Sequence, residues 1–166
     1  MTRANSLTIT TLSLVLLGIA VPAQAQSLKQ QLVGTWTFVS STTKLPDGSP
    51  VWGSNPKGLV IFTENGRYSS QLMRSDRPKF ASNNRAQGTP EENKATALGT
   101  ISSFGTYSVN EASKTFTIRF ESSSYPNLEG TEQTRPFTIT GEELRVTNPA
   151  PSVGGPPSQI VYKRAK

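Results

Sequence analysis

The chain has 166 residues, with 17 lysines and arginines, 11 aspartates and glutamates, a formal net charge of +6, and neither histidine nor cysteine. Without those two residue types there is no Ser–His or Cys–His nucleophile, no common zinc site, no thiolate-held cofactor and no disulfide. The cations are scattered along the sequence rather than gathered in a stripe, so we expect a solvated, mildly basic surface with no nucleic-acid partner. We also expect no metal and no cofactor.

The first 25 residues have the pattern of a secretory signal peptide. Arg3 supplies a positive start, residues 7–21 are largely apolar, and Ala23-Gln24-Ala25 is a small-x-small cleavage site. The apolar run is shorter than the roughly 20 residues that a membrane anchor needs, and no cysteine follows it to carry a lipid. We therefore predict cleavage after Ala25, a periplasmic or secreted location, and no stable membrane insertion afterwards. Removing 25 of the 166 residues leaves 141, enough for one domain over residues 26–166.

The first predicted strand, residues 32–40, alternates between two faces, with Gly34, Trp36 and Phe38 on one of them. A glycine two residues before a tryptophan lets neighbouring backbone close over the indole, so the ring can plug one end of a rolled sheet. We assign structural roles to Gly34 and Trp36, and we expect Arg164 from the last strand to stack on the indole. The polar residues 27–31 before this strand predict a short helix or turn at a mouth of the barrel.

A β-hairpin is predicted next. The apolar run 59–63 and the strand-forming run 67–73 are joined by Glu64-Asn65-Gly66. Asn-Gly between two such runs is the strongest short-range hairpin signal, because both residues tolerate positive φ.

Residues 74–88 are polar, contain proline and are long for a loop, and long loops in compact domains are often lids or binding segments. Few of these residues can bury apolar surface, and ordering each one costs about 1–2 kcal/mol of backbone entropy. We therefore predict a mobile flap over the open end of the barrel, with Phe80 as its apolar anchor.

A helix is predicted directly after this segment. Thr89 can cap it, Pro90 suits the first helical position, and Glu92 stands where the carboxylate of a capping box reaches back. We expect the helix to run to about residue 99 or 102 and to cover one opening of the barrel.

Five further strands are predicted, over residues 104–109, 114–121, 131–139, 143–147 and 159–164. With the first three they make eight strands, each a plausible neighbour of the last. Eight antiparallel strands close into a barrel just wide enough for packed side chains or one small ligand. The predicted fold is therefore all-β, an eight-stranded antiparallel up-and-down barrel with one short helix between strands three and four.

Motifs spread over nearly the whole of residues 26–166 agree with this reading: Leu32–Trp36, Asn55–Gly58, Leu72–Pro78, Gly88–Glu92, Pro126–Asn127 and Gly130–Gln133. In these motifs the chain resembles the bacterial and fungal lipocalin-like domain family. The resemblance implies a small lipocalin-type barrel with a binding or isomerising role. Relatives often carry histidine on the strand written here as Thr117-Ile118-Arg119, and because this chain has no histidine, the resemblance carries no histidine chemistry over to it.

The candidate ligand-binding residues are polar and aromatic side chains on the strands and at the junction with the flap: Tyr68, Met73, Arg74, Asp76, Arg77, Phe80, Phe104, Tyr107 and Arg135. For Asp76 an exposed ion pair with Arg74 or Arg77 is an equally good explanation. Odd spacing puts Glu132 and Arg135 on opposite faces, and Arg135 shares its face with Gln133. No catalytic residue is assigned.

The leading hypothesis is an exported barrel that binds a small, mostly apolar molecule, whose anionic group Arg74 or Arg77 can meet. The alternative is a cofactor-independent isomerase or cyclase on the same barrel, with Tyr68 or Tyr107 and a carboxylate as acid and base. A third possibility, a partner-binding module without a ligand, would show an exposed apolar patch in place of a cavity.

Overall fold

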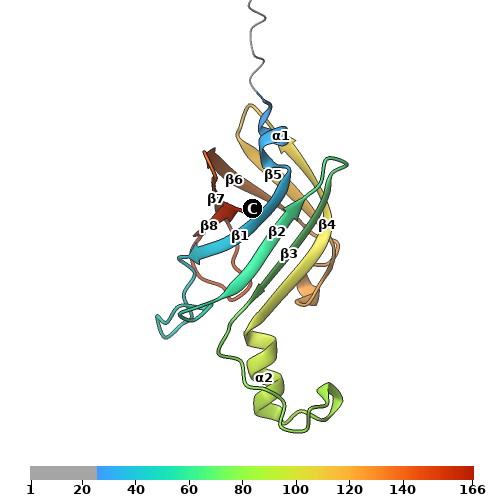
Figure 1. Ribbon diagram of the computed structural model, residues 1–166, viewed down its shortest axis with the longest axis vertical. Helices are drawn as coiled ribbons and strands as arrows, with labels where there is room; N and C mark the ends of the chain where they lie inside the picture. The colour runs from blue at the N-terminus through green and yellow to red at the C-terminus, as the bar shows by residue number, and fades with distance from the viewer. Residues whose placement is uncertain (1–25) are drawn as a thin grey trace, which may run out of the picture.

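In the computed structural model, eight antiparallel strands close into a barrel in which each strand pairs with the next and the last with the first (Figure 1). The structure describes residues 26–166, so the predicted signal peptide lies outside the described residues. The all-β up-and-down barrel and the single helix between the third and fourth strands are confirmed. The strands are β1 (Gly34–Ser41), β2 (Lys57–Phe62), β3 (Arg67–Met73), β4 (Thr100–Asn110), β5 (Thr115–Ser123), β6 (Glu132–Thr140), β7 (Glu143–Asn148) and β8 (Ser158–Arg164).

Apolar residues at alternate positions of the strands fill the barrel. On β5, Phe116, Ile118 and Phe120 are buried, whereas the Arg119 side chain between them points to solvent. Aromatic rings from different strands meet edge to face inside the barrel: the centroids of Phe62 on β2 and Phe116 on β5 lie 5.3 Å apart. The period of two in the sequence therefore decides which residues form the core.

One end of the barrel is closed by Trp36. Its ring is fully buried, and Nε1 donates a hydrogen bond to the carbonyl of Leu32 at 2.8 Å. The Arg164 guanidinium lies over this ring, with Cζ 4.1 Å from the ring centroid. The same guanidinium donates to the carbonyls of Val33, at 3.1 Å, and Gln31, at 2.6 Å. Arg164 thus binds the chain around the end of α1 (Leu28–Leu32) to the last strand.

Two of the glycines with positive φ, a backbone conformation that side chains disfavour, matter for the barrel. Gly66, in the hairpin between β2 and β3, has φ +81° and donates to the carbonyl of Thr63 at 3.0 Å, which confirms the hairpin predicted at Asn65-Gly66. Gly34 has φ +132°, and a Cβ placed there would lie 2.9 Å from Arg164 Nη1. Gly34 is therefore required both for its conformation and for room beside the arginine.

The helix α2 (Pro90–Leu98) begins with the predicted capping box. The Thr89 hydroxyl accepts from the Glu92 N–H at 3.2 Å, and the Glu92 carboxylate accepts from the Thr89 N–H at 2.9 Å. The prediction that this helix covers a barrel opening is wrong, because α2 buries no residue and projects away from the ends of β3 and β4 (Figure 1). Its sequence has no continuous apolar face to pack against the barrel.

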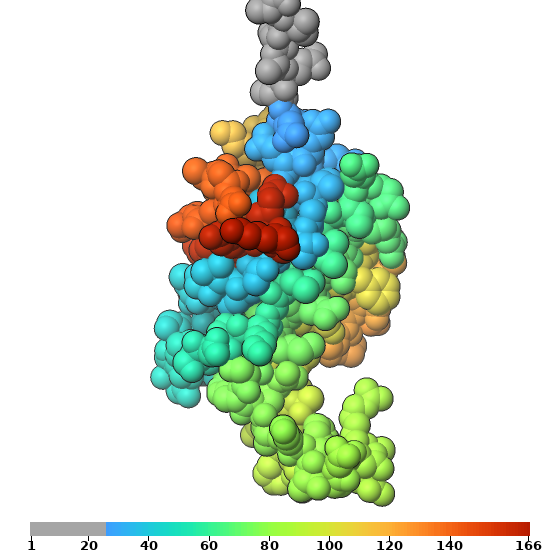
Figure 2. Space-filling model, viewed as in Figure 1, coloured from blue at the N-terminus to red at the C-terminus, as the bar shows by residue number. Residues whose placement is uncertain are grey.

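The prediction of a flap over the open end is also wrong, because residues 74–88 fold against the start of α2. The Phe80 ring packs on Gly88, and the Ala81 N–H donates to the Glu92 carboxylate at 2.9 Å. The segment also contains a short 3₁₀ turn, η1 (Arg85–Gln87). Residues 74–98, which we call the excursion, form the lobe below the barrel in Figure 2. Because Phe80 packs on Gly88 within this segment, its ring does not anchor a flap on the barrel.

Within residues 26–166, no helix is long and apolar enough to cross a membrane.

Candidate functional site

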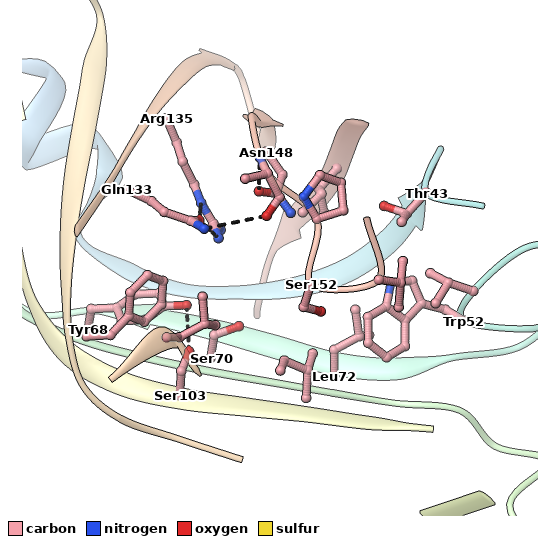
Figure 3. A pocket seen from close by; sticks show the side chains of 18 of the residues that line it. Thr43, Trp52, Tyr68, Ser70, Leu72, Ser103, Gln133, Arg135, Asn148 and Ser152 are labelled. Carbon is pink, nitrogen blue, oxygen red and sulfur yellow. Dashed lines mark hydrogen bonds between the residues drawn. The ribbon is translucent and has the colours of Figure 1, made fainter. Parts of the chain in front are cut away.

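A cavity of about 80 Å³ lies inside the barrel (Figure 3). Its lining includes the β1–β2 and β7–β8 connections, which lie at the end of the barrel away from α1 (Figure 1). One side of its wall is apolar and includes Leu72 from β3, Ile101 from β4 and Ile160 from β8. The other side carries polar groups that the alternation of β3, β4, β6 and β8 turns inward: Tyr68, Ser70, Ser103, Gln133, Arg135 and Tyr162.

Two loops cover the mouth of the cavity. The connection between β1 and β2 contributes Val51 and Trp52, and the connection between β7 and β8 contributes residues 150–153 (Figure 3). The second loop is attached to the cavity wall, because the Gln133 side-chain amide donates to the carbonyl of Ala150 at 3.5 Å. The β7–β8 loop therefore has the position that the sequence suggested for residues 74–88, none of which lines this cavity.

Arg135 is the charged residue of the lining. Its Nε and Nη2 both donate to Gln133 Oε1, at 3.2 and 2.7 Å, so the amide fixes one edge of the guanidinium plane. No carboxylate within residues 26–166 lies within 4.0 Å of this guanidinium, and the cavity lining includes neither aspartate nor glutamate. The charge inside the barrel is therefore positive, and the guanidinium that carries it is hydrogen-bonded to the neutral amide of Gln133.

Two buried tyrosines, Tyr68 and Tyr162, accompany Arg135 in the cavity wall. Tyr68 and Ser103 share a hydrogen bond of 3.2 Å between their hydroxyls. Tyr162 is only 7% exposed, and its hydroxyl has no hydrogen-bond partner within residues 26–166. Burial raises the pKa of Tyr162 and the neighbouring Tyr68 adds to this rise, whereas the positive charge of Arg135 acts in the opposite direction. Tyr162 is therefore a neutral hydroxyl at physiological pH.

The unpartnered hydroxyl of Tyr162 opens into the barrel interior. Among the described residues, no fully enclosed side-chain nitrogen or oxygen lacks a hydrogen-bond partner. Because Tyr162 is buried in the wall and its oxygen has no partner, that oxygen must be accessible from the interior space that the residue lines.

Of the candidate ligand-binding residues, Tyr68 and Arg135 line the cavity. Arg74 and Asp76 pair with each other instead, with Nε–Oδ1 2.8 Å and Nη2–Oδ2 2.6 Å, and the hydrogen bonds from Arg74 lower the pKa of Asp76. Arg77 donates to the carbonyl of Arg74 and to the Thr100 hydroxyl. The two arginines expected to meet an anionic group therefore lie at the base of α2, outside the barrel.

The remaining candidates also lie elsewhere. Phe104 is 47% exposed on the outer surface, because it is out of phase with the buried Ser103, Gly105 and Tyr107 of the same strand. Tyr107 is a core residue whose hydroxyl donates to the carbonyl of Thr63 at 2.8 Å, and burial raises its pKa. Met73 and Phe80 do not reach the cavity.

Sequence reasoning missed Tyr162, Ser103 and the loop before β8. The sequence did contain a signal for Tyr162. It lies two residues after Ile160 on β8, so both side chains point to the inward face of that strand. Nothing in the sequence showed that its hydroxyl would lack a partner.

A tyrosine–carboxylate pair for proton transfer, as the isomerase alternative required, is missing because no carboxylate lines the cavity within the described part of the chain. Residues 26–166 also contain no group of three potential metal-ligating side chains.

An eight-stranded up-and-down barrel with one plugged end and an interior cavity is the architecture of lipocalin-type proteins. The chain belongs to the lipocalin-like domain family, whose model matches residues 33–157. Among solved structures it is similar to the wild-type fluorescent protein UnaG, with 14% sequence identity and a TM-score of 0.37, over 83% of this chain and 100% of that chain. No curated protein matches the sequence.

Proposed function

We propose that this domain binds a small molecule inside its barrel. The observation that carries the proposal is the cavity itself, which combines an apolar wall with a few convergent polar groups, as small-molecule sites do. Membership of the lipocalin-like family supports the same function.

The size of the cavity restricts the ligand. At about 80 Å³ the cavity exceeds the roughly 10–15 Å³ that a single water needs, but it is small for a ligand site. Sites for drug-sized ligands are larger, at about 300–1,000 Å³. A long-chain molecule therefore requires the β7–β8 loop to move away from the mouth.

The proposal can be tested with two matched serines on β3. Ser70 lines the cavity, whereas its neighbour Ser69 lies on the outer surface. A panel of short alcohols, amides and acids is titrated while the fluorescence of Trp52, at the cavity mouth, is followed. We expect a saturable change in the wild type and in Ser69→Phe, and none in Ser70→Phe, whose ring fills the cavity. Equal responses in both variants, or no response to the whole panel in the wild type, would refute interior binding.

We also propose that the protein is exported and that its mature form begins after Ala25. The support is the charge, apolar run and small-x-small site of residues 1–25. Mass spectrometry of the protein recovered from periplasmic and culture-medium fractions tests this, and an intact Met1 terminus in all of the protein would contradict it.

A further inference from the structure

We propose that the ligand of this cavity is a short-chain monocarboxylate, whose two oxygens are bound by the Arg135 guanidinium and the Tyr162 hydroxyl. This inference rests on the proposed function and names the ligand class of the same site. Three features of the wall lead to it: the Arg135 cation (Figure 3) and the Tyr162 hydroxyl, which have no carboxylate and no hydrogen-bond partner, respectively, among residues 26–166, and a small apolar space.

The first feature is the charge of Arg135. A half-buried cation is costly without a compensating anion, and Gln133 offers only the dipole of a neutral amide. Gln133 binds Nε and Nη2, and Nη1 has no hydrogen-bond partner within residues 26–166. The guanidinium is therefore fixed in orientation while one of its nitrogens stays available, which prepares it for an anion without using up its charge.

The second feature is the hydroxyl of Tyr162. A buried polar group without a partner calls for an explanation, and here the oxygen belongs to a residue that lines the same interior space as Arg135. A neutral phenol donates to an anion rather than repelling it, and burial raises the pKa of Tyr162, which keeps the phenol neutral. Tyr68 and Ser103 add a second pair of hydroxyls on β3 and β4. The site is therefore rich in donors and lacks carboxylates, so its ligand must supply acceptor oxygens.

The third feature is the space itself. A carboxylate group takes up part of this small space, so only a short carbon chain fits beside it. Leu72, Ile101 and Ile160 offer that chain an apolar wall opposite the polar cluster. An acid of this length fits the closed barrel, whereas a long-chain fatty acid does not.

Isothermal titration of the purified residues 26–166 tests the inference with four probes: hexanoate, hexanamide, palmitate and inorganic phosphate. We expect hexanoate to bind roughly tenfold or more tightly than each of the others. Equal binding of hexanamide would overturn the carboxylate while leaving interior binding intact, and tighter binding of phosphate or palmitate would overturn the ligand class. Failure of every probe, together with failure of the neutral alcohols, would refute the proposed function as well.

Two variants separate recognition from folding. Tyr162→Phe removes one oxygen and keeps the ring that packs edge to face on Phe38, with centroids 5.9 Å apart. We expect it to weaken hexanoate binding about three- to tenfold and hexanamide binding less, because the hydrogen bond to a charged acceptor is the stronger one. Gln133→Glu keeps the shape of the side chain but gives Arg135 an internal carboxylate partner, which competes with the ligand. We expect a loss of hexanoate binding of roughly tenfold or more.

The matched control is Arg119→Gln, which removes a charge from the outward face of β5, where the side chain is 68% exposed. It should bind hexanoate as the wild type does. If Gln133→Glu also binds hexanoate like the wild type while remaining folded by circular dichroism, Arg135 does not recognise the ligand charge and the inference is wrong.

Discussion

Replacing Arg164 by alanine tests whether the closed end of the barrel stabilises the whole fold. In the structure this guanidinium stacks on Trp36 at 4.1 Å and donates to the carbonyls of Gln31 and Val33. Alanine removes the cation–π contact and leaves two carbonyls near the plug without their charged donors.

The expected magnitude follows from these contacts. A partly desolvated cation–π interaction contributes about 1–2 kcal/mol. Each hydrogen bond to a charged group adds about 1.5–3 kcal/mol, and water that enters the vacated space recovers part of this. We expect Arg164→Ala to lower the free energy of unfolding by about 3–5 kcal/mol, a large share of the ~5–15 kcal/mol typical of a domain. For a chain of this size the corresponding fall in melting temperature is about 10–15 °C.

Urea unfolding of residues 26–166, followed by circular dichroism and tryptophan fluorescence, measures this change. Arg164→Lys should fall between wild type and alanine, because an ammonium keeps the charge but not the planar fork. Arg119→Ala, at an exposed position, should cost less than about 1 kcal/mol. If Arg164→Ala costs no more than Arg119→Ala, the plug does not stabilise the barrel and the reasoning is refuted.

Three further predictions follow from the backbone, the excursion and the exposed carboxylates. Gly34→Ala should lower the urea midpoint, because φ +132° strains any side chain by about 1–3 kcal/mol and the new Cβ crowds Arg164; an unchanged midpoint would contradict this. Phe80→Ala should leave hexanoate affinity and melting temperature nearly unchanged but speed proteolysis near Gly88, because Phe80 packs within the excursion. Weaker hexanoate binding would instead support a flap over the barrel. Hydrogen bonds lower the pKa of Glu92 and Glu121 below 4.5, so their contribution to stability is complete above about pH 5 and is lost as pH falls through the folded pKa values. Urea midpoints at pH 7 and 3 check this, and Glu92→Gln should reduce the difference between them.

Local patterns were enough to predict the elements of this protein. The Asn-Gly turn set the β2–β3 hairpin, and Thr89, Pro90 and Glu92 set the start of α2, because each of these features depends on hydrogen bonds between residues a few positions apart. Period-two alternation assigned Phe116, Ile118 and Phe120 to the interior without any knowledge of the neighbouring strands.

The positions of the long connections depended on tertiary contacts. The sequence of residues 74–88 was compatible with a flap over the barrel, but Phe80 found its packing partner at Gly88 and Glu92 fixed the main chain at Ala81. The mouth is covered instead by the loop before β8, which Gln133 contacts from β6. Such contacts join residues far apart in the sequence, so no local pattern encodes them.

By itself, the sequence determined the barrel, its strand order and the inward face of strands such as β5, because alternation and turn chemistry act over a few residues. Only the tertiary structure decided which arginine can meet a ligand. Judged from the sequence alone, Arg74 and Arg77 are as suitable as Arg135 for binding an anionic ligand. In the structure, however, Arg74 is paired with Asp76, and Arg77 is hydrogen-bonded at the base of α2. Arg135 has no carboxylate partner among residues 26–166 and lines the same cavity as Tyr162, because closure of the sheet turns β6 and β8 toward one interior space. Whether a charge is paired depends on its three-dimensional neighbours, which the order of residues along the chain does not reveal.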